Sequence, residues 1–120
     1  MQGYRIIQED KQYYFILLPQ NNSNQEVGYS PKYNSKEECI KAVATFRKIV
    51  IDNEIDSIDS PLIEIVKTDK GIYFRYKYND KIVFQSRTYN CEPYECHCKK
   101  RIKSIYNQIY EYTSKEVWFI

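Results

Sequence analysis

The chain has 120 residues, of which 42% are hydrophobic and 28% charged, and its formal net charge is +2. This length suits one compact domain, and no stretch approaches the roughly 18 apolar residues that a membrane-spanning helix needs. The first residues lack a signal-peptide pattern, so we expect a cytoplasmic protein, without a membrane association, whose 4 cysteines stay reduced.

The first half of the chain predicts three strands followed by a helix. The strands are expected at Tyr4–Ile7, Tyr13–Leu18 and Glu26–Ser30. Apolar residues at intervals of 4, 3 and 4 then predict the buried side of an amphipathic helix, formed by Cys39, Val43, Phe46 and Val50. Ser35 and Glu38 have the spacing of a capping box at its start. Residues 52–61 are polar and acidic, which predicts a connection.

The second half of the chain repeats this order of elements. Strands are expected at Leu62–Val66, Ile72–Tyr78 and Lys81–Ser86, with Asn79 and Asp80 as a tight hairpin turn. A second helix is predicted to begin near Pro93, which suits a first turn. Its apolar stripe consists of Tyr94, Cys98, Ile102, Ile105 and Ile109. The apolar end of the chain, Glu116–Ile120, predicts a buried strand.

The two halves can be superposed as copies of one unit. Phe15 matches Phe74, Ser30 matches Ser86, and the Tyr-Asn pair at 33–34 matches the pair at 89–90. The stretch "YFRYKYNDKIVFQSRTY" at 73–89 and "YNSK" at 33–36 resemble the repeat signature of the small bacterial YegP-like proteins.

The resemblance covers nearly the whole chain and implies an α+β fold. It implies one domain, residues 1–120, built as a tandem repeat of strand-strand-strand-helix-strand units at about 1–60 and 61–120. The units would form one antiparallel sheet with two helices packed on one face, and the last strand of each unit would be exchanged into its partner. The resemblance implies no reaction, because the family has no established activity.

A cluster of cysteine and histidine residues at the start of the second helix raises the question of a metal site or a catalytic pair. It consists of Cys91, Cys96, His97 and Cys98. Consecutive helical residues point about 100° apart, so the last three cannot converge on one ion. A Cys-His pair without an orienting third group is a weak signal for a nucleophile, and the chain has no phosphate-binding glycine loop. We therefore expect no metal, no cofactor and no enzyme activity, with Cys98 as a small buried residue.

The strands in the middle of each copy differ on the face that the helices would leave uncovered. Strand alternation puts Phe74 and Tyr76 on the helix side of the second copy. The opposite side carries Tyr73, Arg75 and Lys77. The corresponding side of the first copy carries Tyr14, Ile16 and Leu18. One half of this face is apolar and the other basic, which suits a partner or a dimer contact, or residues that merely keep the sheet soluble.

A basic run lies on the second helix, in the more basic half of the chain. Residues 61–120 hold 11 Lys and Arg against 7 Asp and Glu, whereas residues 1–60 hold 7 against 9. Helical spacing puts Lys99, Lys100 and Lys103 opposite the apolar stripe, with Arg101 at the flank. A solvated outer face explains this run, and phosphate contact is the functional alternative.

These patterns favour a non-enzymatic binding module that engages a protein or ribonucleoprotein partner, with RNA contact through the basic half. A narrower version is a phage or mobile-element inhibitor of an RNA-guided host nuclease. The alternative is a structural or stress-related homodimer without a nucleic-acid role. The sequence leaves the choice between monomer and homodimer open.

Overall fold

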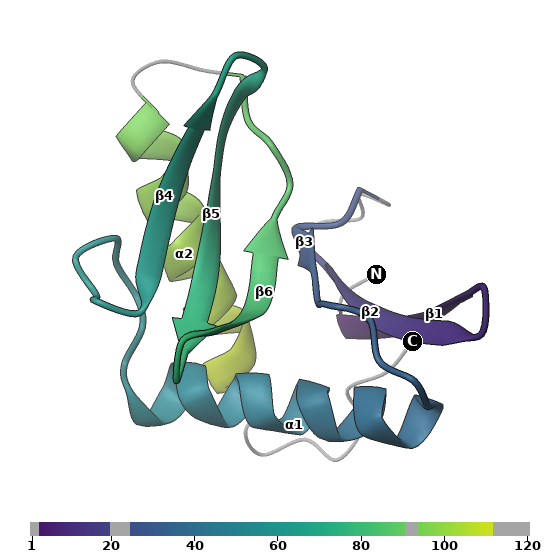
Figure 1. The fold of residues 1–120 in the computed structure, drawn as a ribbon. Coiled ribbons are helices and arrows are strands. Elements are labelled where there is room, and N and C mark those ends of the chain that lie inside the picture. The colour runs from purple at the N-terminus through teal and green to yellow at the C-terminus, as the bar shows by residue number, and fades with distance from the viewer. Residues whose placement is uncertain (1–2, 20–24, 91–93, 112–120) are drawn as a thin grey trace.

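Six strands form one antiparallel sheet in the computed structural model, and two helices pack against it (Figure 1). The structure describes residues 3–19, 25–90 and 94–111. Across the sheet the order of strands is β1-β2-β3-β6-β5-β4. The strands are β1 (Gly3–Glu9), β2 (Gln12–Leu18), β3 (Gly28–Tyr29), β4 (Ile63–Thr68), β5 (Gly71–Tyr78) and β6 (Lys81–Ser86). The helices are α1 (Lys36–Asp52) and α2 (Tyr94–Glu111). The predicted α+β class is confirmed.

Two tight turns set the registers of the hairpins β1-β2 and β5-β6. Asn79 and Asp80 have φ angles of 51° and 63°, and Asp10 and Lys11 have 50° and 69°. Two successive residues with positive φ match the right-handed twist of antiparallel strands, and Asn and Asp tolerate this conformation well. The hairpin turn predicted at 79–80 is therefore confirmed.

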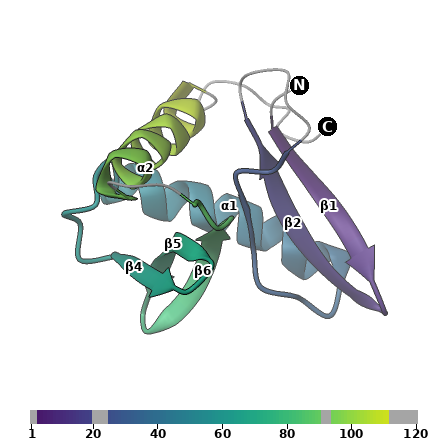
Figure 2. The ribbon, with the colours of Figure 1, turned by 90° about the horizontal axis from the view of Figure 1, so that it is seen from above.

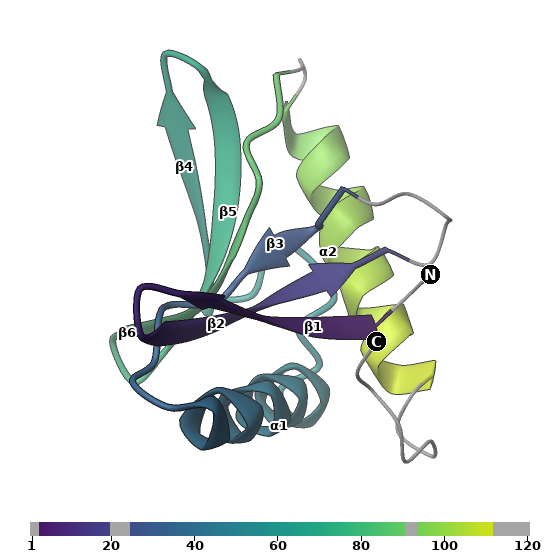
Figure 3. The same ribbon diagram turned by 90° about the vertical axis from the view of Figure 1, so that its right-hand side faces the viewer.

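Strand β3 joins the two halves of the sheet and is much shorter than the expected strand at Glu26–Ser30. Gly28 pairs with Leu17 of β2 on one side and with Ser86 of β6 on the other. A Cβ atom on Gly28 would lie 2.4 Å from the Gln85 carbonyl oxygen, so the chains approach this closely because glycine has no side chain. Figure 3 shows the hairpins β1-β2 and β4-β5 at a steep angle on either side of this seam.

Both helices bury the sides that the sequence predicts. The eight described apolar positions of the two predicted stripes are each 1% exposed or less: Cys39, Val43, Phe46, Val50, Cys98, Ile102, Ile105 and Ile109. The side chain of Tyr94, the ninth predicted position, lies outside the described part of the chain. At the start of α1, the Glu38 backbone N–H donates to Ser35 Oγ at 3.1 Å, as an N-cap does. Figure 2 shows α1 running under both halves of the sheet, with α2 against the β4-β5-β6 half.

An aromatic cluster forms the centre of the core between α1 and the sheet. The Phe46 ring of α1 stacks on Phe84 with 4.6 Å between ring centroids and meets Tyr76 edge-on at 5.3 Å. Phe15 of β2 lies 6.0 Å from both phenylalanine rings, which connects the two halves of the sheet. The face that carries these rings is thus the covered face, and no described helix packs on the opposite face.

The resemblance implies that the last strand of each unit is exchanged into the other unit, and the described residues contain one candidate for such a strand. Residues 53–62, all of which the structure describes, form no strand. The strand that follows α1 is β4, and it pairs with β5 of the second half of the chain. The strand expected at 116–120 lies outside the described residues. Among the described helices, neither is both long and apolar enough to cross a membrane.

Candidate binding face of the sheet

The uncovered face of the sheet carries one row of side chains that crosses all the strands. Antiparallel pairing sets these residues next to one another, one per strand, because facing residues point to the same side. From β1 to β4 in sheet order, the row consists of Arg5, Ile16, Tyr29, Gln85, Arg75 and Glu64. It therefore joins the apolar half and the basic half that the sequence predicts for this face.

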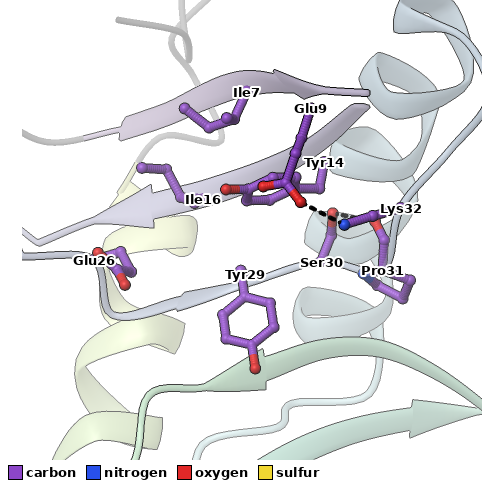
Figure 4. A pocket seen from close by; sticks show the side chains of 9 residues that line it. All are labelled: Ile7, Glu9, Tyr14, Ile16, Glu26, Tyr29, Ser30, Pro31 and Lys32. Carbon is purple, nitrogen blue, oxygen red and sulfur yellow. Dashed lines mark hydrogen bonds and ion pairs between the residues drawn. The ribbon is translucent and has the colours of Figure 1, made fainter. Parts of the chain in front are cut away.

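A hollow of about 540 Å³ lies in the apolar half of this face (Figure 4). Its walls include Ile7 of β1, Tyr14 and Ile16 of β2, and Tyr29 of β3, together with Pro31. The three residues on β1 and β2 are half-buried, and Tyr29 is 39% exposed. These side chains give the hollow an apolar floor that is open to solvent, which suits the side chains of a partner.

Charged side chains stand at the rim of the hollow. Lys32 Nζ lies 2.7 Å from Glu9 Oε1, and Figure 4 shows this ion pair at one end. The hydrogen bond to Glu9 raises the pKa of Lys32 above its usual value. Glu26 lines the hollow as well and has no ion pair among the described residues. Among the described residues, the charge at the rim that has no ion pair is therefore the negative charge of Glu26.

Tyr29 belongs to this site, although it is not among the residues predicted from the sequence. Gln85 Nε2 of β6 donates to Tyr29 Oη at 2.8 Å, which orients the ring across the seam between the two halves. The signal lay in strand alternation: Ser30, matched to Ser86, is buried, so its neighbour Tyr29 must point to the other face. Its position beside Gln85 depends on the pairing of β3 with β6, which connects distant segments.

The basic half of the face carries less free charge than the sequence predicts. Arg75 Nε donates to the Glu64 carboxylate of β4, and Lys77 Nζ lies 3.8 Å from the other oxygen of the same carboxylate. Tyr73, Arg75 and Lys77 are all half-buried on the expected face. One carboxylate thus offsets part of the positive charge that was expected to be available to phosphates.

Leu18 does not lie on an accessible surface, contrary to the prediction that groups it with Tyr14 and Ile16. Its side chain is only 2% exposed. Leu18 is the last residue of β2, and its carbonyl oxygen accepts a hydrogen bond of 2.9 Å from Gln108 Nε2 of α2. The end of the strand therefore meets the last turns of α2, where strand alternation no longer decides burial.

The lysines of α2 lie away from the basic half of the sheet face. Lys99, Lys100 and Lys103 are exposed, as predicted, and Arg101 at the flank is half-buried. They point away from the sheet, because the opposite side of α2 packs on the covered face of β5. Lys103 Nζ also lies 3.3 Å from Asp56 Oδ2. The structure therefore does not bring the two groups of basic candidates onto one surface.

The cysteine and histidine cluster of the second helix is described only in part. Cys98 is fully buried, as expected, whereas His97 is exposed. Cys91 and the side chain of Cys96 lie outside the described residues. Within residues 3–19, 25–90 and 94–111, no three His, Cys, Asp or Glu side chains come together as a group that could hold a metal ion.

Comparison with solved structures places this architecture among known folds. No protein-family model matches the chain, and no curated protein sequence does. A UPF0339 protein from Shewanella oneidensis superposes with a TM-score of 0.67 at 18% identity, over 89% of this chain and 84% of that one. The yegP protein of Escherichia coli, described as a protein of unknown function, superposes with a TM-score of 0.64 at 23% identity, over 88% and 87%. The chain therefore has the YegP-like fold that its sequence pattern implied.

Proposed function

We propose that this protein is a non-enzymatic binding module that engages a partner protein through the apolar half of the uncovered sheet face. One observation carries this proposal: the hollow over β1, β2 and β3 exposes an apolar floor to solvent. Ile16 and Tyr29 are neighbours on that floor, joined by strand pairing. Apolar floors of this kind on small proteins are typical of interaction sites.

The pairing of charges favours a protein over RNA as the partner at this face. Glu64 already neutralises part of the charge of Arg75 and Lys77, whereas phosphate binding needs free cations. Engagement of a ribonucleoprotein, and inhibition of an RNA-guided nuclease in particular, are narrower proposals. Direct binding of a purified nuclease complex to this protein would test them.

We also propose that the chain is a tandem repeat, with β4 as a strand exchanged between units. Two matching contacts support this. The Phe15 backbone N–H donates to Ser30 Oγ at 2.9 Å, and the Phe74 N–H donates to Ser86 Oγ at 3.0 Å. In such a repeat, the contacts that both units share build the fold. The position occupied by Ile16 in the first unit is occupied by Arg75 in the second, and this difference distinguishes the binding half of the face from the supporting half.

A matched pair of charge substitutions tests the binding proposal. Ile16→Asp places a carboxylate in the hollow, and Val66→Asp places one on the same face of β4, at another half-buried strand position. Affinity capture from the source cell, followed by reconstitution with the purified partner, measures the effect. We expect Ile16→Asp to weaken binding by at least about tenfold and Val66→Asp to change it little, since burying a charge in an apolar contact is costly.

Two results would contradict the proposal. One is equal binding of the partner by the wild type and the Ile16→Asp variant. The other is that light scattering of the purified protein, without any other partner, gives the mass of a dimer and that Ile16→Asp abolishes the dimer. That result would assign the face to a homodimer contact.

A further inference from the structure

Two arginines and a histidine gather around Tyr89, where the chain passes from β6 to α2. The guanidinium carbon of Arg87 lies 4.8 Å from the centroid of the Tyr89 ring, and that of Arg101 lies 5.8 Å from it. The His97 ring centroid lies 6.3 Å from the same ring. His97 and Arg101 are one helical turn apart on α2, so both point toward Tyr89 from the same side of the helix.

Neither arginine forms an ion pair with a carboxylate of the described residues. The ion pairs in the described residues are Lys32 with Glu9, Arg75 and Lys77 with Glu64, and Lys103 with Asp56. None of these pairs includes Arg87 or Arg101, although both are half-buried. A partly desolvated guanidinium without a counterion is unfavourable, and an anion supplied from solution would relieve that cost.

Tyr89 is held firmly and gives these side chains a fixed platform. Its backbone N–H donates to the Ile72 oxygen at 2.7 Å, and the Ile72 N–H donates back at 2.8 Å. The Tyr89 side chain is 6% exposed. Burial raises the pKa of its hydroxyl, while the charges of Arg101 and Arg87 act in the opposite direction. Both guanidinium groups therefore act on the same phenol.

We propose that Arg87, Arg101 and His97 form a binding site for a phosphate group. Guanidinium groups fit phosphate oxygens with paired hydrogen bonds, and the imidazole adds a third donor. Because the Tyr89 ring is buried, it cannot stack on a base, so the site recognises the phosphate and not the group attached to it. This site is separate from the uncovered sheet face, and its test does not depend on the partner protein.

NMR titration of the full chain with inorganic pyrophosphate tests the proposal, at constant ionic strength with chloride as the comparison anion. We expect saturable shifts at the backbone amides of 87–89 and 97–101 that chloride does not produce. Arg101→Gln and Arg87→Gln should each weaken binding by about tenfold or more, the usual cost of a lost charge-assisted hydrogen bond. Lys99→Gln removes a neighbouring exposed charge of α2 and should change the affinity less than about twofold.

A second titration, with a single-stranded RNA of about ten nucleotides, separates the two sources of phosphate. Saturation by pyrophosphate assigns a small phosphate-bearing ligand. Saturation by the RNA alone, lost in the two arginine variants, assigns a nucleic-acid backbone. Absence of saturable shifts at these amides of the wild type with either probe overturns the proposal, whatever the stability of the variants. Equal weakening by Lys99→Gln also overturns it.

Discussion

Arg75 and Glu64 form an ion pair across β5 and β4, and the same Glu64 carboxylate lies 3.8 Å from Lys77 Nζ. The basic half of the uncovered face is thus partly neutralised by a neighbouring strand of the same sheet. In the apolar half, Ile16 and Tyr29 line a hollow that is open to solvent. This contrast is why we propose β2 and β3 as the binding surface.

Removing the Glu64 carboxylate should expose the charge that it offsets. We expect Glu64→Gln to increase retention on a heparin column at low salt, because Arg75 and Lys77 lose their shared counterion. The loss in free energy of unfolding should stay below about 1 kcal/mol, as is usual for partly exposed ion pairs.

Glu54→Gln is the control, because it removes one negative charge from an exposed residue outside the sheet. Equal retention of the two variants would mean that net charge alone decides binding to the column. In that case the pairing with Glu64 would not limit the anion affinity of the face.

Two buried serines should contribute similarly to stability. Ser30 Oγ accepts from the Phe15 N–H and donates to the Pro31 carbonyl oxygen at 2.8 Å. Ser86 Oγ does the same between Phe74 and the carbonyl of the next residue. Alanine at either serine leaves a buried N–H without this acceptor, which costs about 1–3 kcal/mol. Urea unfolding measures this cost.

Ser104→Ala on the exposed side of α2 serves as the control and should be neutral or slightly stabilising, because alanine favours helices. A loss below about 0.5 kcal/mol for both Ser30→Ala and Ser86→Ala would contradict the role of these hydroxyl groups in the sheet.

The seam between β3 and β6 should not accept a side chain at position 28. In Gly28→Ala the new methyl group would lie 2.6 Å from the Phe84 ring as well as close to the Gln85 oxygen. We expect a loss of about 2 kcal/mol or more in the free energy of unfolding, measured by thermal and urea denaturation. Tyr29→Phe keeps the backbone and removes only the Gln85 contact, so it should cost much less. Comparable losses for the two variants would refute the steric account.

The buried hydroxyl of Tyr76 should make stability depend on pH in the alkaline range. Burial raises the pKa of Tyr76, whereas the pKa of tyrosine in the unfolded chain is about 10. The folded state therefore keeps its proton to higher pH, and the stability present below about pH 10 falls as the pH rises beyond it. Urea midpoints at pH 8 and about pH 11 measure this fall.

Tyr76→Phe should lose less stability over this range than the wild type. At neutral pH it should be as stable as the wild type or more so, because the Tyr76 hydroxyl is buried without a hydrogen-bond partner in the described part of the chain. An unchanged alkaline loss in this variant would exclude Tyr76 as its source.

Local sequence patterns predicted most of the helices and strands but few features of the candidate binding face. Apolar spacing was sufficient for α1 and α2, because a helix buries one side whatever it packs against. The pairing of Glu64 with Arg75 could also be predicted from the sequence, because a tight turn between residues 68 and 71 fixes the register and sets 64 opposite 75.

The remaining features of the site depend on contacts between segments that are distant in sequence. Strand β3 pairs with β6 through only two residues, and the local sequence pattern of neither strand predicts this pairing. The burial of Leu18 depends on Gln108 of α2, which is 90 residues away. Tertiary packing overrides strand alternation at such points.

Photo-crosslinking from position 29 tests the central claim most directly. A photoreactive phenylalanine analogue at Tyr29 lies in the hollow, and one at Tyr78 lies at the far end of β5 with almost the same exposure, 38% against 39%. In the source cell, the account predicts one discrete crosslinked protein from position 29 that is absent from position 78 and is lost on Ile16→Asp. The same product from both positions, or none from position 29, would contradict it.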